Sequence, residues 1–261
     1  NALGAGVVKP GMCVDGMGTV ECITVAFDEP VLTDAMRTHN YGCYPHVVAE
    51  QYATIAYNYS CGSLLRWWRD HFGAQELAEA RMRQMDVWDV ILEDLPEGPS
   101  GLLWLPYFAG SGTPWLDPHA KGAILGLTLD TDRKRLVKAL IEGTCYELDL
   151  NIRALEEAGV KIDRLRATGG GSRSDTWLQL KADITGKPVV RLNVSESGCQ
   201  AGAILGGVAL GVWRDVHQAT RDLVVEGEVF SPRKDAQKAY EDLRAVYAES
   251  WPALREITHR L

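Results

Sequence analysis

The sequence predicts an α/β fold in which a sheet is flanked by helices. Short segments rich in β-branched residues, typical of strands, recur at 12–27, 162–167 and 189–192. Two long stretches, 132–159 and 234–261, carry apolar residues at the spacing of amphipathic helices. Because both kinds of segment share the chain, we expect helices that cover a mixed sheet.

The composition suits an ordinary globular protein and disfavours several classes of partner. The 261 residues are 46% hydrophobic and 24% charged, which suits one large domain or two small ones. The net charge of −8 disfavours nucleic acid, because phosphates are not attracted to an acidic surface. The longest apolar run, 201–213, is too short to span a bilayer, and no signal-peptide pattern opens the chain. We therefore expect a cytoplasmic protein with no nucleic-acid or membrane partner.

The six cysteines give no sign of a metal site or a disulfide framework. None forms a Cys-x-x-Cys pair, and none has a histidine at metal-ligand spacing. In a chain of this size they are most simply reduced thiols that are buried as small apolar residues. We expect no metal ligands in this chain.

The stretch 162–185 combines a strand, a glycine turn and the start of a helix. Three glycines, at 169–171, follow the strand, and Ser172 or Ser174 can cap the helix. Bare backbone at such a turn lets a flat or anionic ligand approach the first N–H groups of the helix. The spacing is neither that of a dinucleotide fingerprint nor that of a Walker A loop. A ligand-binding turn and a tight connection without any ligand both remain open.

The residues 12–27 predict two strands around a Gly-rich hairpin turn that contains Gly18 and Thr19. Taken alone, this pattern is also that of a plain hairpin. Residues 44–59 indicate one or two further strands. A helix is expected over 64–72, with Ser60 or Ser63 as its cap.

The remaining segments add helices and one buried strand. The periodicity of 75–95 predicts an amphipathic helix whose Met and Trp residues, Met82, Met85 and Trp88, lie in the core. Residues 102–107 predict a buried strand, and irregular structure is expected over 110–118.

Two segments near the ends of the chain are expected to be helical. Residues 1–8 have the composition of a helix tail that Pro10 and Gly11 end. The stretch 195–212 carries small residues every fourth position, so its helix presents bare faces that can pack closely against a sheet or another helix.

The most specific pattern in the chain lies between 122 and 142, and it resembles the second signature of the FGGY carbohydrate kinases, the xylulokinase and glycerol kinase family. One position departs from it, Arg135, where an acidic, amide or His residue is usual. The matching residues are Gly122, Ile124, Gly126, Leu127, Leu136, Ala139, Leu140, Ile141 and Glu142.

Other family motifs occur in the same order along the chain. The hairpin at 12–27 resembles the second phosphate hairpin of the family, and 162–185 resembles its adenosine motif. The frame Leu-Pro-Tyr, Thr-Pro and Asp-Pro is present over 105–118. Xylulokinases often have Glu-Arg where this chain has Ser111 and Gly112, which weakens an assignment to xylulose.

The resemblance implies an actin-like ATPase (ribonuclease H-like) fold and a domain assignment. Residues 1–261 would form the C-terminal nucleotide-binding domain of such a kinase, with a helical insertion over 74–100. The N-terminal sugar-binding domain is absent from this chain. The general-base Asp of the family is expected just upstream of Asn1, so no catalytic residue is assigned here and the chain alone is expected to be inactive.

The resemblance also implies which residues hold ATP. Gly18 and Thr19 of the hairpin would face the ATP phosphates. Gly62, at the head of the helix expected over 64–72, and Arg66, one turn further on, would lie beside them. The glycine turn would lie against the adenine or ribose, and Asp175 near the edge of the base or sugar. Two alternatives stay open: Arg66 as an ordinary surface arginine, and Asp175 as a favourable first-turn charge without a ligand. The expected nucleotide-binding residues are Gly18, Thr19, Gly62, Arg66, Gly170, Gly171 and Asp175.

These features predict ATP-dependent phosphorylation of a sugar or polyol, with a pentulose such as xylulose favoured. The expected cofactors are ATP and Mg²⁺, the metal being bound through the nucleotide. The expected partners are the sugar or polyol and the missing N-terminal kinase domain, and a homodimer is left open. The alternative is a non-catalytic nucleotide-binding or interaction module of the same fold.

Overall fold

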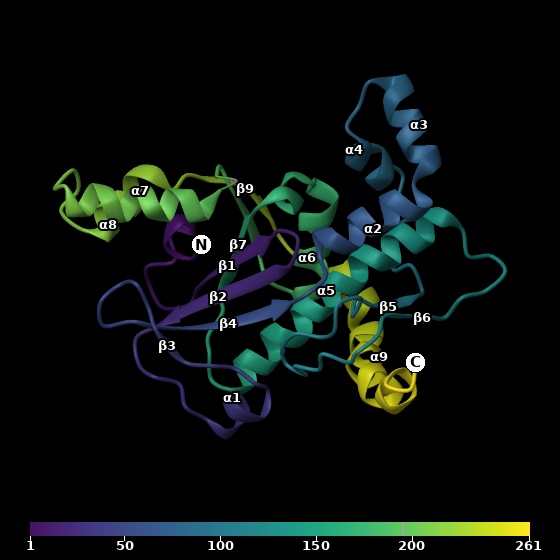
Figure 1. The fold of residues 1–261 in the computed structure, drawn as a ribbon, viewed down its shortest axis with the longest axis horizontal. Helices are drawn as coiled ribbons and strands as arrows, with labels where there is room; N and C mark the ends of the chain where they lie inside the picture. Colours follow the sequence, from purple (N-terminus) through teal and green to yellow (C-terminus); the bar gives the residue numbers. More distant parts are fainter. Residues whose placement is uncertain (195) are drawn as a thin grey trace.

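The computed structural model describes residues 1–194 and 196–261, and its centre is a mixed seven-stranded sheet with helices on both faces (Figure 1). The strands lie in the order β3-β4-β2-β1-β7-β8-β9. β1 pairs antiparallel with β2 and parallel with β7, so the middle of the sheet joins a hairpin to a parallel unit. The strands are β1 (Met12–Met17), β2 (Glu21–Phe27), β3 (Tyr44–Pro45), β4 (Tyr52–Asn58), β7 (Arg164–Thr168), β8 (Val189–Leu192) and β9 (Glu226–Phe230).

The main core lies between this sheet and a layer of three helices. These are α5 (Arg133–Glu157), α6 (Asp175–Thr185) and α9 (Lys234–Thr258). α6 packs against both α5 and α9, and its buried side chains share the main core with those of β1 and β7. A small antiparallel pair, β5 (Leu103–Leu105) and β6 (Ala123–Leu125), packs on α5 through β5.

A smaller apolar cluster covers part of the opposite face of the sheet. There a 3-10 helix, η1 (Leu3–Ala5), packs against α7 (Ser197–Ala209) and α8 (Val216–Leu223). The contact between η1 and α7 is close, because a Cβ on Gly4 would lie 1.8 Å from the Ser197 carbonyl oxygen. The close approach depends on the glycine of η1 and not on the small residues of α7, since a Cβ on Gly202 or Gly206 would meet no atom of the described residues within 4 Å. The close packing predicted for the small-residue faces of 195–212 is therefore not found at these two positions.

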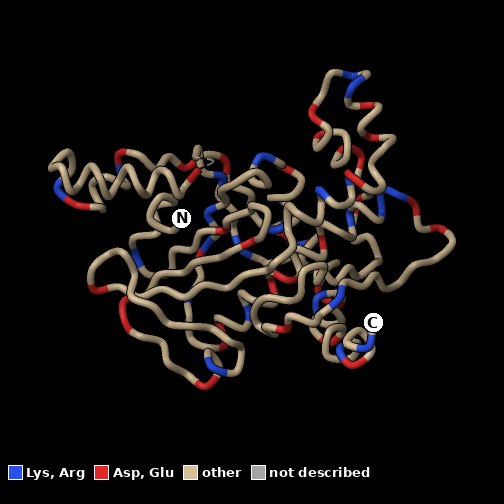
Figure 2. The backbone as a smooth tube through the Cα atoms, in the orientation of Figure 1, with Lys and Arg blue, Asp and Glu red and all other residues tan. Residues whose placement is uncertain are grey.

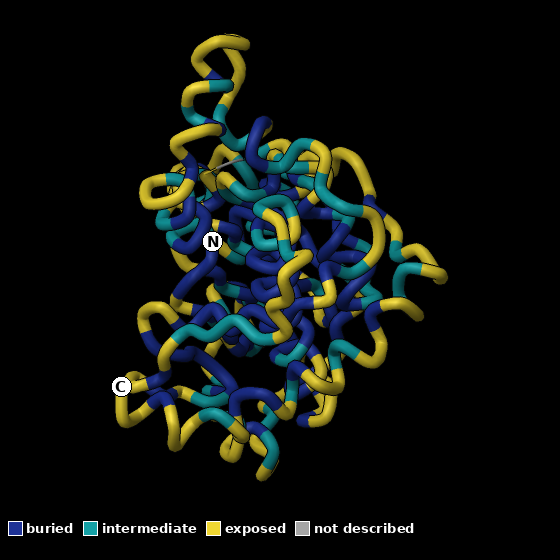
Figure 3. The backbone as a smooth tube through the Cα atoms, turned by 90° about the vertical axis from the view of Figure 1, so that its right-hand side faces the viewer, coloured by how far each residue is buried: buried dark blue, intermediate teal, exposed yellow. Residues whose placement is uncertain are grey.

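Two short helices, α3 (Ala74–Arg83) and α4 (Val87–Leu92), project from the body of the molecule, and the α4 segment lines the site described below (Figure 1). α2 (Gly62–Phe72) leads into α3 and α4, and the outermost part of this projection is exposed (Figure 3). Charges of both signs lie along it (Figure 2). Arg83, for example, donates to Glu79 over 2.8 Å and to Glu93 over 3.0 Å. The remaining helix, α1 (Asp34–Thr38), packs against α5.

Most elements expected from the sequence are confirmed. The hairpin at 12–27, the strand at 189–192 and the long helix after Asp132 are all present. Asp132 caps α5 by accepting from the Arg135 N–H over 2.8 Å. Of the two serines that could cap α6, it is Ser174 whose hydroxyl accepts from the Trp177 N–H, over 3.2 Å.

Several expectations are corrected. Residues 1–8 form only the three-residue η1, which Gly6 ends in a left-handed conformation (φ +71°). The single helix expected over 75–95 is divided into α3 and α4 at Gln84, which also has a positive φ. Met82 and Met85 are exposed rather than in the core, because only one side of the projecting helices reaches the body.

The expected burial of the cysteines is also only partly right. Cys13, Cys61 and Cys145 are buried, but Cys22 and Cys43 are half-buried and Cys199 is exposed on α7. All six are free thiols, as expected. No helix among residues 1–194 and 196–261 combines the length and the apolar character needed to cross a bilayer.

Candidate nucleotide-binding site

A pocket of about 540 Å³ lies where the β1–β2 turn, the start of α2, the α4 segment and the glycine turn after β7 come together. These four elements are far apart in the sequence, and the parallel pairing of β1 with β7 brings two of them side by side. Six of the seven residues expected to bind nucleotide line this pocket, whereas Asp175 does not. The six are Gly18, Thr19, Gly62, Arg66, Gly170 and Gly171.

The hairpin turn is fixed to the first turn of α2 by backbone hydrogen bonds. The Gly62 N–H donates to the Gly18 carbonyl over 3.0 Å, and the Ser63 N–H donates to the Thr19 carbonyl over 3.0 Å. A Cβ on Gly62 would lie 2.5 Å from the Gly18 oxygen, so only glycine permits this approach. The hairpin thus supplies the acceptors for the first amides of α2, and the expected cap by Ser60 or Ser63 is wrong.

These hydrogen bonds decide which hairpin donors face the pocket. Both carbonyls point to α2, and the Gly18 N–H donates to the Val20 carbonyl over 3.1 Å. Across residues 1–194 and 196–261, neither the N–H nor the hydroxyl of the exposed Thr19 has a hydrogen-bond partner. Thr19 therefore offers two donors to an anion at this point of the pocket.

Two arginines add positive charge to the pocket. Arg66 on α2 and Arg173 at the end of the glycine turn are exposed, and neither has an ion-pair or hydrogen-bond partner within the described parts of the chain. Guanidinium groups suit phosphate oxygens because they donate from a rigid, planar fork. The carboxylates of Asp86 and Asp89 line the same pocket, so the two guanidinium groups offer local donors to an anion without giving the pocket a net positive charge.

The glycine turn presents one open position to the pocket. Gly169 has φ +88°, and a Cβ there would lie 2.7 Å from the Met17 carbonyl oxygen, so this residue fixes the turn. A Cβ on Gly170 would meet no atom within 4 Å. Gly170 is therefore the place where the turn leaves room for a ligand.

Gly171 is constrained by the protein itself. A Cβ on Gly171 would lie 2.8 Å from the Met17 Cε and 3.2 Å from the Trp177 ring, and the φ of Gly171 is not left-handed. The reason for glycine at this position is packing of the turn against β1 and α6.

Asp175 is engaged outside the pocket. Its carboxylate forms an ion pair with Arg191 of β8, and the Arg191 Nε donates to the Ser172 carbonyl over 2.9 Å. This pair connects the first turn of α6 with β8, which lies between β7 and β9 in the sheet. A contact between Asp175 and a nucleotide stays a prediction.

The α4 segment is the part of the pocket that the sequence did not predict. Trp88, expected in the core, is half-buried and lines the pocket, with the Arg69 guanidinium 5.1 Å from its ring. Asp86 caps α4 by accepting from the Trp88 N–H over 2.9 Å. Asp is a common residue at a helix start, so the sequence can suggest the Asp86 cap. It does not show whether the ring of Trp88 faces the core or the pocket. Further pocket residues not predicted are Met17, Leu65, Asp86, Asp89, Leu92, Arg173, Ser174 and Trp177.

Neither a reactive thiol nor a cluster of metal ligands is found at the pocket among the described residues. Cys61 precedes α2, but burial raises the pKa of its thiol well above the ordinary value, which leaves it protonated. In the described part of the chain, no three His, Cys, Asp or Glu side chains are grouped to hold a metal ion.

Comparisons with known proteins identify the family. Residues 16–210 match the model of the C-terminal domain of the FGGY family of carbohydrate kinases, and the chain belongs to this family. It is 32% identical over 250 residues to a gluconokinase of Bacillus licheniformis, covering 94% of this chain and 48% of the relative. It is 25% identical over 260 residues to a xylulose kinase of Bacillus subtilis, covering 100% and 50%.

A solved structure agrees with these relatives. The xylulose kinase of Lactobacillus acidophilus superposes with a TM-score of 0.82 and 26% identity, covering 97% of this chain and 49% of the other. The fold is therefore the actin-like ATPase fold of these sugar kinases, as the sequence resemblance implied. The chain spans about half the length of the curated relatives it matches.

Proposed function

We propose that this chain supplies the ATP-binding half of an enzyme that phosphorylates a sugar or polyol. The observation that carries the proposal is the convergence of the hairpin turn, the α2 start and the glycine turn on one pocket that contains unpaired donors. Membership of the FGGY family supports the same activity.

The pocket residues fit a nucleoside triphosphate. Thr19 would donate from its N–H and hydroxyl to phosphate oxygens, and Arg66 and Arg173 would balance their charge. Gly170 leaves space for a flat group, which Trp88 would face from α4. We infer that the phosphates lie toward the hairpin and the base toward the glycine turn. Mg²⁺ would arrive with the nucleotide and neutralise part of its charge.

Phosphoryl transfer needs little covalent chemistry from the protein and depends mainly on positioning and electrostatics. We propose that this half contributes the phosphate donors, whereas the sugar pocket and the general-base Asp come from the N-terminal part of the kinase. Holding ATP without a positioned acceptor gives no transfer, so the 261-residue chain by itself should not phosphorylate a sugar.

The substrate class follows from the relatives and the sequence motifs. We favour a pentulose such as xylulose, in line with the similarity to the xylulose kinase of B. subtilis. A sugar acid is the competing candidate, and the identities favour it, because the gluconokinase of B. licheniformis is 32% identical to this chain and the xylulose kinase 25%. A cytoplasmic location, where ATP is available, belongs to the same proposal.

A coupled assay of ADP release tests the proposal. The chain alone, and the enzyme in which it is joined to its N-terminal half, are each given ATP with xylulose, other pentuloses, gluconate and glycerol. We expect sugar-dependent turnover only for the joined enzyme. Turnover by the chain alone would contradict the proposal that the sugar pocket and the general base lie in the N-terminal part of the kinase. ATP binding without turnover by the joined enzyme on any sugar or polyol would favour a non-catalytic nucleotide-binding module.

A further inference from the structure

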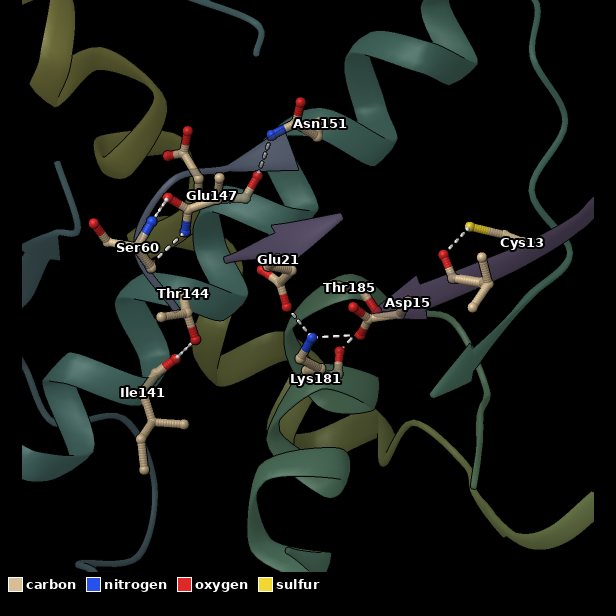
Figure 4. A network of polar contacts seen from close by, with 12 residues as sticks. Cys13, Asp15, Glu21, Ser60, Ile141, Thr144, Glu147, Asn151, Lys181 and Thr185 are labelled. Atoms are coloured by element: carbon tan, nitrogen blue, oxygen red, sulfur yellow. Dashed lines mark hydrogen bonds and ion pairs between the residues drawn. The ribbon is translucent and has the colours of Figure 1, made fainter. Parts of the chain in front are cut away.

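A buried ion cluster joins α6 to the two strands of the β1–β2 hairpin (Figure 4). The Lys181 ammonium of α6 donates to the carboxylates of Asp15 on β1 and Glu21 on β2. All three side chains are almost completely enclosed, with exposed fractions of 0%, 0% and 3%. We call these three residues the Lys181 cluster.

The cluster is placed at the base of both ligand-facing turns. Asp15 and Glu21 stand on either side of the hairpin turn, and Glu21 comes two residues after Thr19. Lys181 belongs to the helix that begins directly after the Gly170 turn. The side chain of Met17, between the two, approaches the Gly171 position. One ammonium group therefore connects the proposed phosphate side of the pocket with its proposed base side.

The Lys181 cluster is poorly suited to stabilising the core, because burying charged groups costs desolvation free energy. Two carboxylates share one ammonium, and one oxygen of each, Asp15 Oδ1 and Glu21 Oε2, has no hydrogen-bond partner in the described residues. Burial raises the pKa of the Glu21 carboxyl to about 7, although the attraction of Lys181 opposes this. Buried ion groups can often be replaced by apolar residues without loss of stability, whereas removal of one member is costly. Stability alone therefore does not account for charged residues at these positions.

We propose that Lys181 is a positioning residue, which holds the Gly18–Thr19 turn at a fixed place relative to the Gly170 turn. The inference rests on the proposed nucleotide site. An ammonium with two directed contacts fixes both strands of the hairpin at once, which a non-directional apolar contact does not do. The Thr19 donors are thereby kept at the distance that spans the phosphates of a nucleotide whose base lies at Gly170.

Two variants separate positioning from simple stabilisation. Lys181→Met leaves two unpaired carboxylates in the core, so it should lower the melting temperature as well as nucleotide affinity. The triple variant Asp15→Leu, Glu21→Met, Lys181→Met removes the charges together and replaces them with apolar side chains. We expect the triple variant to regain most of the melting temperature but to stay at least tenfold weaker for Mg·ATP by calorimetry.

A matched control lies on the same helix. Asp183 of α6 is fully buried and pairs with Arg233, which donates to it over 2.6 Å, at a place outside the pocket lining. Arg233→Met also leaves a buried carboxylate without its cation. It should lower the melting temperature while Mg·ATP affinity stays within about twofold of the parent.

Hydrogen exchange on the ligand-free chain gives an independent readout. The Gly18, Gly62 and Ser63 amides, which are hydrogen-bonded at this turn, should exchange at least tenfold faster in the triple variant than in the parent or in Arg233→Met. A triple variant with parental affinity and slow exchange at the hairpin would overturn the inference and leave the proposed function standing. A parent chain that binds no Mg·ATP would overturn the proposed function itself, and the positioning role with it.

Discussion

At the scale of single residues, the structure distinguishes three neighbouring glycines that look alike in the sequence. Gly169 has a left-handed φ, Gly171 packs against Met17 and Trp177, and Gly170 faces open space. Of these three, only Gly170 could carry a side chain without a clash in the described residues or a strained φ. The run of three predicted a turn, but which of its members faces a ligand depends on the strand placed beside it.

This distinction leads to a prediction about affinity. Gly170→Val should weaken Mg·ATP binding at least tenfold in calorimetric titrations, because the added side chain occupies the open part of the pocket. Its melting temperature should stay close to that of the parent. Gly171→Val is the contrasting variant and should lose stability first, since its side chain meets Met17. Unchanged affinity in a folded Gly170→Val variant would place the ligand elsewhere.

Thr19 gives a prediction about rate. Thr19→Ala in the joined enzyme should lower kcat by roughly 10²–10³, the usual effect of losing one donor to a charge that develops in the transition state. The KM for the sugar should change little, because Thr19 lies on the nucleotide side. The neighbouring exposed residue provides the control, Val20→Ala, which should keep parental kinetics. A parental kcat for Thr19→Ala would make the hairpin a purely structural element.

At the scale of elements, α5 carries a buried carboxylate that couples the fold to pH. Glu147 is fully enclosed, and its Oε2 accepts from the hydroxyls of Tyr107, over 2.9 Å, and Tyr247 of α9, over 2.7 Å. Burial raises its pKa from 4.5 to about 7. Because the folded pKa is the higher one, the stabilising contribution is complete below pH 4.5 and is lost as the pH rises through 7.

The corresponding prediction concerns Glu147→Gln. At about 1.4 kcal/mol per pKa unit, the shift from 4.5 to about 7 is worth about 3 kcal/mol. Urea unfolding at pH 5 and pH 8 should show the parent losing about this much relative to the variant. Other buried carboxylates, such as Asp149, titrate in both proteins and cancel in the difference. Equal pH dependence in parent and variant would show that Glu147 is already ionised in the fold.

The elements also show how far the sequence could predict the site. The hairpin, the α2 helix and the glycine turn could be predicted from local glycine, β-branched and apolar patterns. Their assignment to a nucleotide site, with the six residues that line the pocket, came from the resemblance to the FGGY kinases. Trp88 could not be assigned in this way, since an amphipathic pattern identifies an apolar face but not the neighbour that it meets. The cap of α2 was missed for a similar reason, because its acceptors come from a hairpin some forty residues earlier.

At the scale of the whole molecule, the pocket depends on one topological feature. Parallel pairing of β1 and β7 places Gly16 opposite Thr168, so the hairpin turn and the glycine turn leave the sheet side by side. The Lys181 cluster then connects both strands of the hairpin to α6, the helix that follows the glycine turn. Long-range pairing of this kind is not visible in local periodicity, and the order of family motifs along the chain was the only sign of it in the sequence.

The central claim is that this pocket holds ATP between Thr19 and Gly170, and a crystal structure with a non-hydrolysable ATP analogue and Mg²⁺ tests it most directly. We predict phosphate oxygens within hydrogen-bonding distance of the Thr19 N–H and hydroxyl, and the base against Gly170. The same map decides whether Asp175 leaves Arg191 to contact the nucleotide. An analogue bound outside this pocket, or bound with its phosphates at the glycine turn, would contradict the account.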